Sequence, residues 1–596
     1  MGIANAFMPY YRSDPQYQYV ANATWTKGTH NIRWGMDLSR VHLNHTQPEF
    51  GGATHGAQGG FNFEGGPTTI PTISPNQYNA WGTFLLGMPT TIGKILQVPD
   101  VYRTRTWAHS LYVRDQWQAT RKLTLSYGIR WEYFPMPTRE DRGIERYDFD
   151  LNKILVCGVG QVPKDCGVDI SEKLFAPRIG LAYRASDSFV IRAGYGITND
   201  PYNLARPLRT NHPILLALNI RGPNSFQPAG LLKNGIPAIP TPSLGDGVID
   251  IPSNVAVNTL AEKFERGYIQ SWNLTLQKQM RWGFVGQAGY VATRQTRQLG
   301  TIDLNVGRVG GGEASRPFNQ RFRRTAETRV IGPIGTSRYD SLQTSLERRF
   351  TAGYHLQVAY TWSKTIGICC GGLITDIVTP AIKIPEFYHL NRALLTIDRP
   401  HNLEITGIAE LPFGKGKAWL SNGGIAGRLF GGWQLNALLS SYSGRPFTPG
   451  ASGASLNAPG NDQRADQVKG EVVKTGSAGR GVAYYDPFAY APVTQARFGT
   501  AGFSSLRGPG IVNVDAGLHR AFAIKERWKL DFRAELFNVS NTPHFTEPGA
   551  NVSNRQLNPD GSIRTLNGFM EITSTPNTGR EGYDERIFRF SLRMTF

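Results

Sequence analysis

The chain has 596 residues, of which 18% are charged and 11% aromatic, with 67 glycines and a formal net charge of +19 at pH 7. Soluble domains usually carry about 25% charged residues. The composition therefore indicates a turn-rich, aromatic-rich and charge-poor protein. The positive charge does not favour a nucleic-acid partner, because Lys and Arg are dispersed, with few runs beyond RFRR at 321–324.

Membrane and export signals of the usual helical kind are missing from the sequence. The best apolar stretch, IGICCGGLITDIVTPAIKIP, contains Gly, Pro, Asp and Lys, so we expect no transmembrane helix, which needs about 18 or more apolar residues. The start, MGIANAFMPYYRSDPQYQY, has no basic segment followed by an apolar one. Either the protein is cytosolic, or its beginning is missing.

Alternation of polar and apolar residues with period two is the dominant pattern, as in WKLDFRAELF at 528–537. Few helical patterns of similar length compete with it. The alternation predicts fifteen strands, at 17–26, 30–42, 105–119, 122–134, 174–185, 188–199, 268–281, 284–294, 340–350, 354–365, 400–411, 428–442, 513–524, 527–539 and 586–596. The structure of residues 51–104 is not predicted.

The connections between these strands alternate between two lengths. Tight turns fall at 26–30, 119–123, 185–189, 280–284, 350–354 and 524–528, with a longer one at 412–427. Long irregular segments rich in Gly, Pro, Asn and Ser separate the hairpins, for example 200–260, 295–337 and 446–510. Loops this long are uncommon in compact soluble domains, whereas short periplasmic turns and long extracellular loops are typical of outer-membrane barrels.

Two further patterns fit a barrel wall with one face in lipid. Aromatic residues lie near predicted strand ends, where they form girdles at the lipid interfaces: Trp107, Trp117, Trp131, Tyr133, Trp272, Trp282, Trp362, Trp433, Tyr442 and Trp528. Polar residues at alternate positions are expected to line the lumen, where they could contact a plug or a solute: Arg130, Gln277, Lys529, Arg533, Arg589 and Arg593. Bacterial barrels normally have an even number of strands, so fifteen suggests that at least one is missing.

Cysteine and histidine offer little chemistry. Cys157 and Cys166 lie within one predicted extracellular loop, and a short loop-closing disulfide is favoured over two free thiols. Cys369 and Cys370 are adjacent; a vicinal disulfide or a metal contact is the alternative to thiols without catalytic function, which is favoured. His42 and His45 have metal-compatible spacing without a neighbouring carboxylate. No catalytic or cofactor motif is present, so we predict no enzyme, no cofactor and no metal.

Several stretches resemble the β-barrel of the Oar-like TonB-dependent outer-membrane transporters. They are LYVRDQWQATRKLTLSYGIRWEYF, APRIGLAYR, DRPHNLEITGIAELPFGKGKAW, GGWQLNALLSSYSGRPFTP, AELFNVSNTPHF and the last strand, RIFRFSLRMTF. The resemblance implies an all-β transmembrane antiparallel barrel of about 22 strands with a plug. About fifteen strands are present in residues 1–596, so we expect the C-terminal part of such a barrel, without plug, signal peptide or TonB-contacting segment.

The resemblance also implies a location, a role and partners. The protein is expected in the bacterial outer membrane, in contact with lipid, taking up a solute whose identity the sequence does not show. Its last strand resembles the signal read by the barrel-assembly machinery, at Arg589, Ser591, Met594 and Phe596. The TonB system would act only through the missing plug. The main rival is a structural or adhesive surface barrel without transport, and a soluble β-sandwich module is third.

Overall fold

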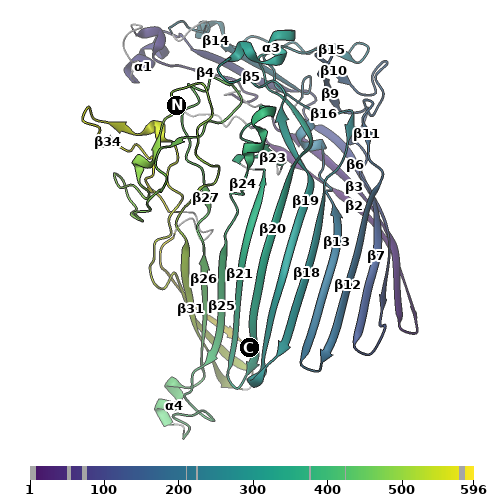
Figure 1. Ribbon diagram of the computed structural model, residues 1–596, viewed down its shortest axis with the longest axis vertical. Coiled ribbons are helices and arrows are strands. Elements are labelled where there is room, and N and C mark those ends of the chain that lie inside the picture. Colours follow the sequence, from purple (N-terminus) through teal and green to yellow (C-terminus); the bar gives the residue numbers. More distant parts are fainter. Residues whose placement is uncertain are drawn as a thin grey trace.

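The computed structural model describes residues 8–49, 55–69, 77–209, 211–222, 226–368, 370–374, 377–422, 424–525, 527–575 and 584–596. Strands dominate this part of the chain, and none of its helices combines the length and apolar character needed to cross a bilayer. The largest element is one sheet of 21 strands. Figure 1 shows this sheet as a tall curved wall, with tight turns at its lower end and folded loops at its upper end.

Fifteen long strands follow one another in both sequence and space, and each is antiparallel to the next. They are β2 (Gln16–Lys27), β3 (His30–Thr46), β6 (Tyr102–Trp117), β7 (Leu123–Tyr133), β12 (Leu174–Ser186), β13 (Phe189–Asn199), β18 (Tyr268–Gln279), β19 (Phe284–Asp303), β20 (Thr328–Thr351), β21 (Tyr354–Ile368), β25 (His401–Glu410), β26 (Trp433–Tyr442), β31 (Ile511–Lys525), β32 (Trp528–Phe537) and β35 (Ile587–Thr595). The predicted all-β fold and its fifteen strands are confirmed.

Short strands complete the main sheet near its upper end. They are β1 (Tyr11–Ser13), β8 (Thr138–Arg139), β16 (Val257–Leu260), β22 (Cys370–Ile374), β23 (Ile377–Pro380) and β24 (Arg392–Leu394). β16 and β23 pair in parallel with β20 and β19, because these two long strands extend well beyond their hairpin neighbours. The predicted ranges 284–294 and 340–350 are therefore too short. A register shift between Gln295 and Gln298 marks the point where the ladder is interrupted and then resumes.

Lipid-facing and inner faces follow from strict alternation along each strand. On β7 and β32 the apolar side chains lie on the convex side, where Tyr127, Ile129 and Trp528 are 44%, 46% and 43% exposed. The five buried apolar clusters of the described residues all belong to the long loops and the adjoining strand ends. Within the part of the wall that the structure describes, no apolar core lies on the concave side, which is the arrangement that a membrane barrel requires.

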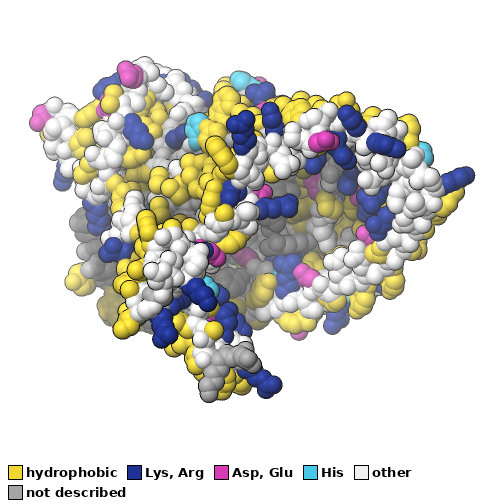
Figure 2. Space-filling view, turned by 90° about the horizontal axis from the view of Figure 1, so that it is seen from below, with side chains coloured by type: hydrophobic (Ala, Val, Ile, Leu, Met, Phe, Trp, Pro, Cys, Tyr) yellow, Lys and Arg dark blue, Asp and Glu magenta, His cyan; other side chains and the backbone are white. Residues whose placement is uncertain are grey.

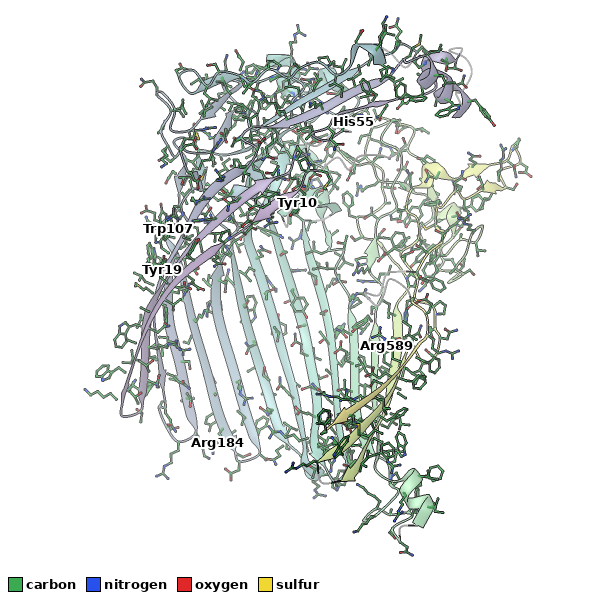
Figure 3. All side chains as sticks on the ribbon, turned by 180° about the vertical axis from the view of Figure 1, so that it is seen from behind. Tyr10, Tyr19, His55, Trp107, Arg184 and Arg589 are labelled. Atoms are coloured by element: carbon green, nitrogen blue, oxygen red, sulfur yellow. A yellow bond between two sulfur atoms is a disulfide. The ribbon has the colours of Figure 1, made fainter. Side chains whose placement is uncertain are left out.

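The two edges of the wall are β2 and β35. Among the described residues no backbone ladder joins them. Figure 3 shows Tyr19 of β2 near one edge and Arg589 of β35 near the other, on opposite sides of the view. Each edge strand offers unpaired backbone donors and acceptors, which favour pairing with another strand.

Turn chemistry explains why the strands form hairpins at the lower end. Between β20 and β21, Ala352 and Gly353 have φ values of 51° and 85°. Two successive residues with positive φ make the turn type whose twist matches an antiparallel hairpin. Such a turn joins the two strands without a crossover, so sequence neighbours become sheet neighbours.

The longer connection near residue 420 differs from the prediction. Residues Gly424–Phe430 form the helix α4, which lies below the wall in Figure 1. Gly432 has φ of 74° and the strand β26 begins only at Trp433. The predicted strand start at 428 is therefore wrong, because the two glycines after Phe430 end the helix and re-aim the chain before the strand.

The long loops are folded rather than irregular. Their sheets are formed by β4 (Gly60–Asn62), β5 (Thr91–Gln97) and β14 (Leu215–Arg221); β9 (Glu145–Asp148), β10 (Lys153–Val156) and β15 (Val248–Asp250); β11 (Asp169–Ile170) and β17 (Lys263–Phe264); β27 (Pro446–Phe447) and β30 (Leu506–Arg507); β28 (Asp466–Gln467) and β29 (Tyr490–Ala491); and β33 (Gln556–Leu557) and β34 (Ile563–Thr565). Their helices are α1 (Gln77–Leu85), α2 (Ala205–Leu208) and α3 (Pro317–Phe322), with 3-10 turns at Gly66–Thr68, Leu232–Asn234, Glu313–Ser315, Pro385–Asn391, Pro487–Ala489 and Val552–Asn554; one more, Arg281–Gly283, lies in a tight turn. Irregularity was the wrong expectation for these segments, because their scattered apolar residues meet in shared cores.

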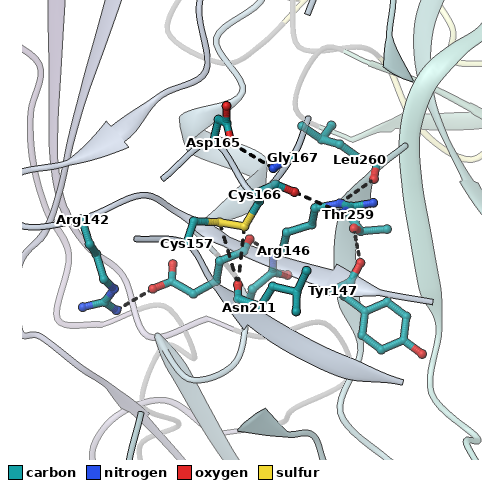
Figure 4. Close-up of a disulfide and its surroundings, with 12 residues drawn as sticks. Arg142, Arg146, Tyr147, Cys157, Asp165, Cys166, Gly167, Asn211, Thr259 and Leu260 are labelled. Carbon is teal, nitrogen blue, oxygen red and sulfur yellow. Dashed lines mark hydrogen bonds and ion pairs between the residues drawn. A yellow bond between two sulfur atoms is a disulfide. The ribbon is translucent and has the colours of Figure 1, made fainter. Parts of the chain in front are cut away.

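A disulfide tightens one of these folded loops. Cys157 and Cys166 are bonded, and both side chains are buried. Figure 4 shows Arg146 beside this bond, donating to the carbonyl oxygens of Cys166 at 3.4 Å and Leu260 at 3.3 Å. The bond and the arginine together connect residues 145–170 to the segment near 260. The side chains of Cys369 and Cys370 lie outside the described residues.

Candidate functional site

The inner wall of β3, β6, β7 and β12 brings arginines into one row. Residues directly opposite each other in an antiparallel pair share a face of the sheet. Arg33 lies opposite Arg114, Arg114 opposite Gly128, and Gly128 opposite Arg178. The three arginines therefore project from the same face at the same level, although they are far apart in the sequence.

A pocket of about 530 Å³ lies against this row. Its polar lining includes four arginines and one carboxylate, together with neutral polar residues: Arg33, Arg114, Arg130, Arg178, Asp115, Asn31, Gln116 and Ser126. Glycines occupy two positions of its floor, Gly128 and Gly180. Because glycine has no side chain, these two positions leave room above the sheet. The hollow therefore depends on glycine at these two strand positions. Figure 2, seen from the turn end, shows Lys and Arg side chains around a hollow.

The arginines of the pocket differ in their partners. Arg130 donates to Glu132 at 2.8 Å and lies 3.8 Å from Asp37. Within the described residues, Arg33, Arg114 and Arg178 form no ion pair with a carboxylate, and the buried Nε of Arg33 has no hydrogen-bond partner. The row therefore carries positive charge that the described protein does not neutralise, which is the electrostatic requirement for binding an anion.

The residues expected to line the lumen lie at several places on the same inner face. Arg130 faces the pocket, and Gln277 of β18 accepts a hydrogen bond from Arg192 of β13. Lys529 lies 3.1 Å from Asp531 on β32. The others form ladder pairs between β32 and β35: Arg533 with Ser591, Glu535 with Arg589, and Asp531 with Arg593. The structure separates these six residues into different parts of the wall and brings no single site together from them.

Sequence reasoning missed Arg33, Arg114 and Arg178. Each occupies the polar face of an alternating strand, which was the available signal. Their common level depends on hairpin register across four strands, and a shift by one residue would turn a side chain to the other face. Only the folded sheet shows that they are neighbours.

The structure also places the two histidines and one of the aromatic residues that the sequence analysis singled out. His42 and His45 are three residues apart on β3 and so lie on opposite faces, with His42 against Tyr17 and His45 against Tyr10. Metal-binding groups of three or more His, Cys, Asp or Glu do not occur within the described part of the chain. Tyr442, expected in an outer girdle, faces inward instead and donates to Glu404 at 2.8 Å.

Comparison with known proteins identifies the family to which this sheet belongs. A profile of the family described as outer membrane beta barrel domain matches residues 1–587. The chain belongs to this outer-membrane barrel family. The predicted location in the bacterial outer membrane is therefore confirmed. In barrels of this kind the short turns generally face the periplasm and the long loops face the outside. No curated protein matches the sequence.

Solved structures similar to this outer-membrane barrel are outer-membrane transporters and receptors. They include the transporter YddB from Escherichia coli, with a TM-score of 0.47 and 11% identity over 98% of this chain and 54% of that one. A mutant ferric enterobactin receptor PfeA from Pseudomonas aeruginosa has a TM-score of 0.45 and 10% identity, over 98% and 54%. The siderophore receptor PiuA from Acinetobacter baumannii has a TM-score of 0.42 and 10% identity, over 98% and 57%. The chain spans about half the length of these proteins.

Proposed function

We propose that this outer-membrane barrel takes part in solute uptake as a transporter of the TonB-dependent type and performs no catalysis. The observation that carries the proposal is the two-faced wall. Large apolar side chains such as Tyr127, Ile129 and Trp528 are exposed on its convex side, and its concave side carries polar and charged side chains. A hydrophilic solute needs a passage lined with polar groups, and a barrel wall can offer one only on its inner side, because polar groups that face hydrocarbon are costly.

Open edges set a condition on this function. A passage closes only when β2 and β35 each have a strand beside them. The sequence resemblance supplies the rest of the proposal: further barrel strands and a plug, through which the TonB system acts. The same resemblance supports recognition of β35 by the barrel-assembly machinery.

Uptake by the bacterium that makes this protein tests the proposal. We would delete the coding region, restore it on a plasmid, and measure accumulation of three labelled probes: a neutral oligosaccharide, a sugar phosphate and a ferric catecholate. The expected result is a several-fold loss of uptake of at least one probe on deletion, restored by the plasmid. A protonophore should remove the difference, because TonB-dependent uptake requires an energised inner membrane.

The rival function predicts a different outcome. An adhesive or structural barrel would use its folded loops, which have buried apolar clusters of their own, to bind an extracellular partner. Unchanged uptake of all three probes, with loss of cell adhesion to a surface on deletion, would overturn transport and favour anchoring.

A further inference from the structure

We propose that Arg33, Arg114 and Arg178 form a binding site for a phosphate group on the inner wall of the barrel. The inference deepens the proposed function, on which it rests for its physiological meaning, by naming the class of solute: one that carries a phosphate. It concerns the pocket of about 530 Å³ above the row formed by β3, β6, β7 and β12.

The register gives the three arginines a spacing that suits one anion. Neighbouring strands lie about 5 Å apart, so Arg33 and Arg114, on adjacent strands, start about 5 Å from each other. Arg114 and Arg178 flank β7 and start roughly 10 Å apart, with Gly128 between them. Because glycine adds no side chain, the space between these two guanidinium groups stays open to a ligand.

Glycine at position 128 is also required by its surroundings. A Cβ atom there would lie 2.6 Å from the carbonyl oxygen of Val113 and 2.7 Å from Cβ of Arg114. At Gly180, one level below, an added Cβ would meet nothing closer than 3.6 Å. The first glycine is therefore fixed by close packing, whereas the second tolerates a side chain and offers a place to alter the pocket.

The positive charge of the arginine row favours an anion as its ligand. Because the described residues give these arginines no carboxylate partner, we expect that anion to come from the solution. The nearby acidic side chains already have partners. Asp37 and Glu132 are engaged by Arg130, and Asp115, which also lines the pocket, contacts His30 at 2.6 Å and accepts a hydrogen bond from Tyr127 at 2.9 Å. Among the described residues, the row of Arg33, Arg114 and Arg178 has no such partner, and Arg33 keeps a buried Nε without an acceptor. Three like charges at this spacing repel each other, so a bound anion would remove an unfavourable interaction as well as form new ones.

Geometry favours phosphate over a single carboxylate. A guanidinium group donates two parallel hydrogen bonds to one planar carboxylate or to two oxygens of a phosphate. A carboxylate has its two oxygens in one plane and carries one negative charge, so it accepts hydrogen bonds near that plane and offsets the charge of one arginine of the three. A phosphate monoester has three free oxygens in a tetrahedral arrangement and close to two negative charges, so it can accept from arginines on both sides of Gly128.

Binding to the purified full chain in detergent micelles tests this site. We would titrate inorganic phosphate, glucose 6-phosphate and citrate by calorimetry, after checking each preparation for folded, heat-modifiable migration. Both phosphate ligands should bind, and binding should weaken as salt is raised, since screening reduces the attraction. Stronger binding of glucose 6-phosphate than of inorganic phosphate assigns the site to a phosphorylated solute, and the reverse assigns it to the free ion. Citrate binding as tightly as both would overturn the choice of phosphate.

Four variants separate the site from general charge effects. R33Q, R114Q and R178Q should each weaken phosphate binding at least about 10-fold, the loss expected for a charge-assisted hydrogen bond. G180E keeps all three arginines and should also abolish binding by supplying an internal carboxylate.

The matched control is R533Q, which removes the same charge from the inner wall at β32, outside the pocket. It should bind phosphate like the unmodified chain. Equal weakening by R533Q, or unchanged binding in R114Q and R178Q, would overturn the proposal. Failed uptake with intact phosphate binding would count against transport alone, and intact uptake without phosphate binding would count against this site alone.

Discussion

Arginine placed on the lipid face of β20 should destabilise the protein far more than arginine placed one residue away. Leu346 faces outward, opposite Gly286 on β19 and Val358 on β21. It precedes Thr351, at the tight-turn end of β20, by five residues, which corresponds to roughly 12 Å of height in a tilted strand. That height is close to the middle of an apolar band about 25 Å tall.

The expected cost follows from this depth. Arginine at the bilayer midplane of a barrel costs roughly 2–4 kcal/mol, so Leu346→Arg should reduce the folded-to-unfolded ratio by roughly 100-fold. Ser345 faces the inner wall, opposite Gln287 and Ala359. Ser345→Arg should change the free energy of unfolding by less than about 0.5 kcal/mol, as for most exposed polar sites.

Urea titration of the purified full chain in lipid vesicles, followed by tryptophan fluorescence, measures both free energies of unfolding. The two variants add the same side chain to neighbouring positions of one strand, so each controls for the other. Equal costs, or a larger cost for Ser345→Arg, would refute the assignment of the convex face to lipid.

Three further predictions concern the loops and the last strand. Replacing Cys157 and Cys166 by alanine should destabilise their loop by about 2.5 kcal/mol, from the chain entropy of a short closed loop, measured as faster amide hydrogen exchange there; unchanged exchange would contradict it. Burial lowers the pKa of His212 to about 4 from 6.5; because the unfolded loop then binds the proton more tightly, stability should fall as pH drops from about 6.5 to about 4, by at most about 3 kcal/mol. Proteolysis of the loop at several pH values should show this trend in the unmodified chain and not in His212→Leu. Phe596→Ala should lower the amount of heat-modifiable protein in the outer membrane, whereas Phe588→Ala, on the same face of β35, should not; equal effects would argue against a terminal assembly signal.

The strands and their order could be predicted because the information is local. Alternation along residues such as Trp528, Leu530 and Phe532 fixes which face is apolar. Tight turns of two to five residues pair a strand with its successor. These two rules predicted the fifteen strands and the hairpin partners that tight turns connect, whereas pairs such as β3 with β6 and β7 with β12 are joined across long loops. They failed at residues 424–430, where two following glycines end a short helix, a boundary that alternation does not report.

The folded loops could not be predicted because their contacts are not local. The segments around 150 and 250 share a sheet, and residues near 450, 490 and 570 share one buried cluster. Each segment alone has too few apolar residues to show a pattern, and only their meeting makes a core. Length and composition predicted that these segments are loops. They did not predict that the loops have buried cores of their own.

The sequence by itself determined that this protein is a two-faced antiparallel wall, because the period of two and the turn residues act within a few positions. Tertiary structure alone decided what the wall's polar side can do. Arg33, Arg114 and Arg178 lie on strands separated by long loops, and ladder hydrogen bonds set their levels residue by residue. A slip of one position would move an arginine to the lipid face, so the site exists only in the register that the whole sheet imposes.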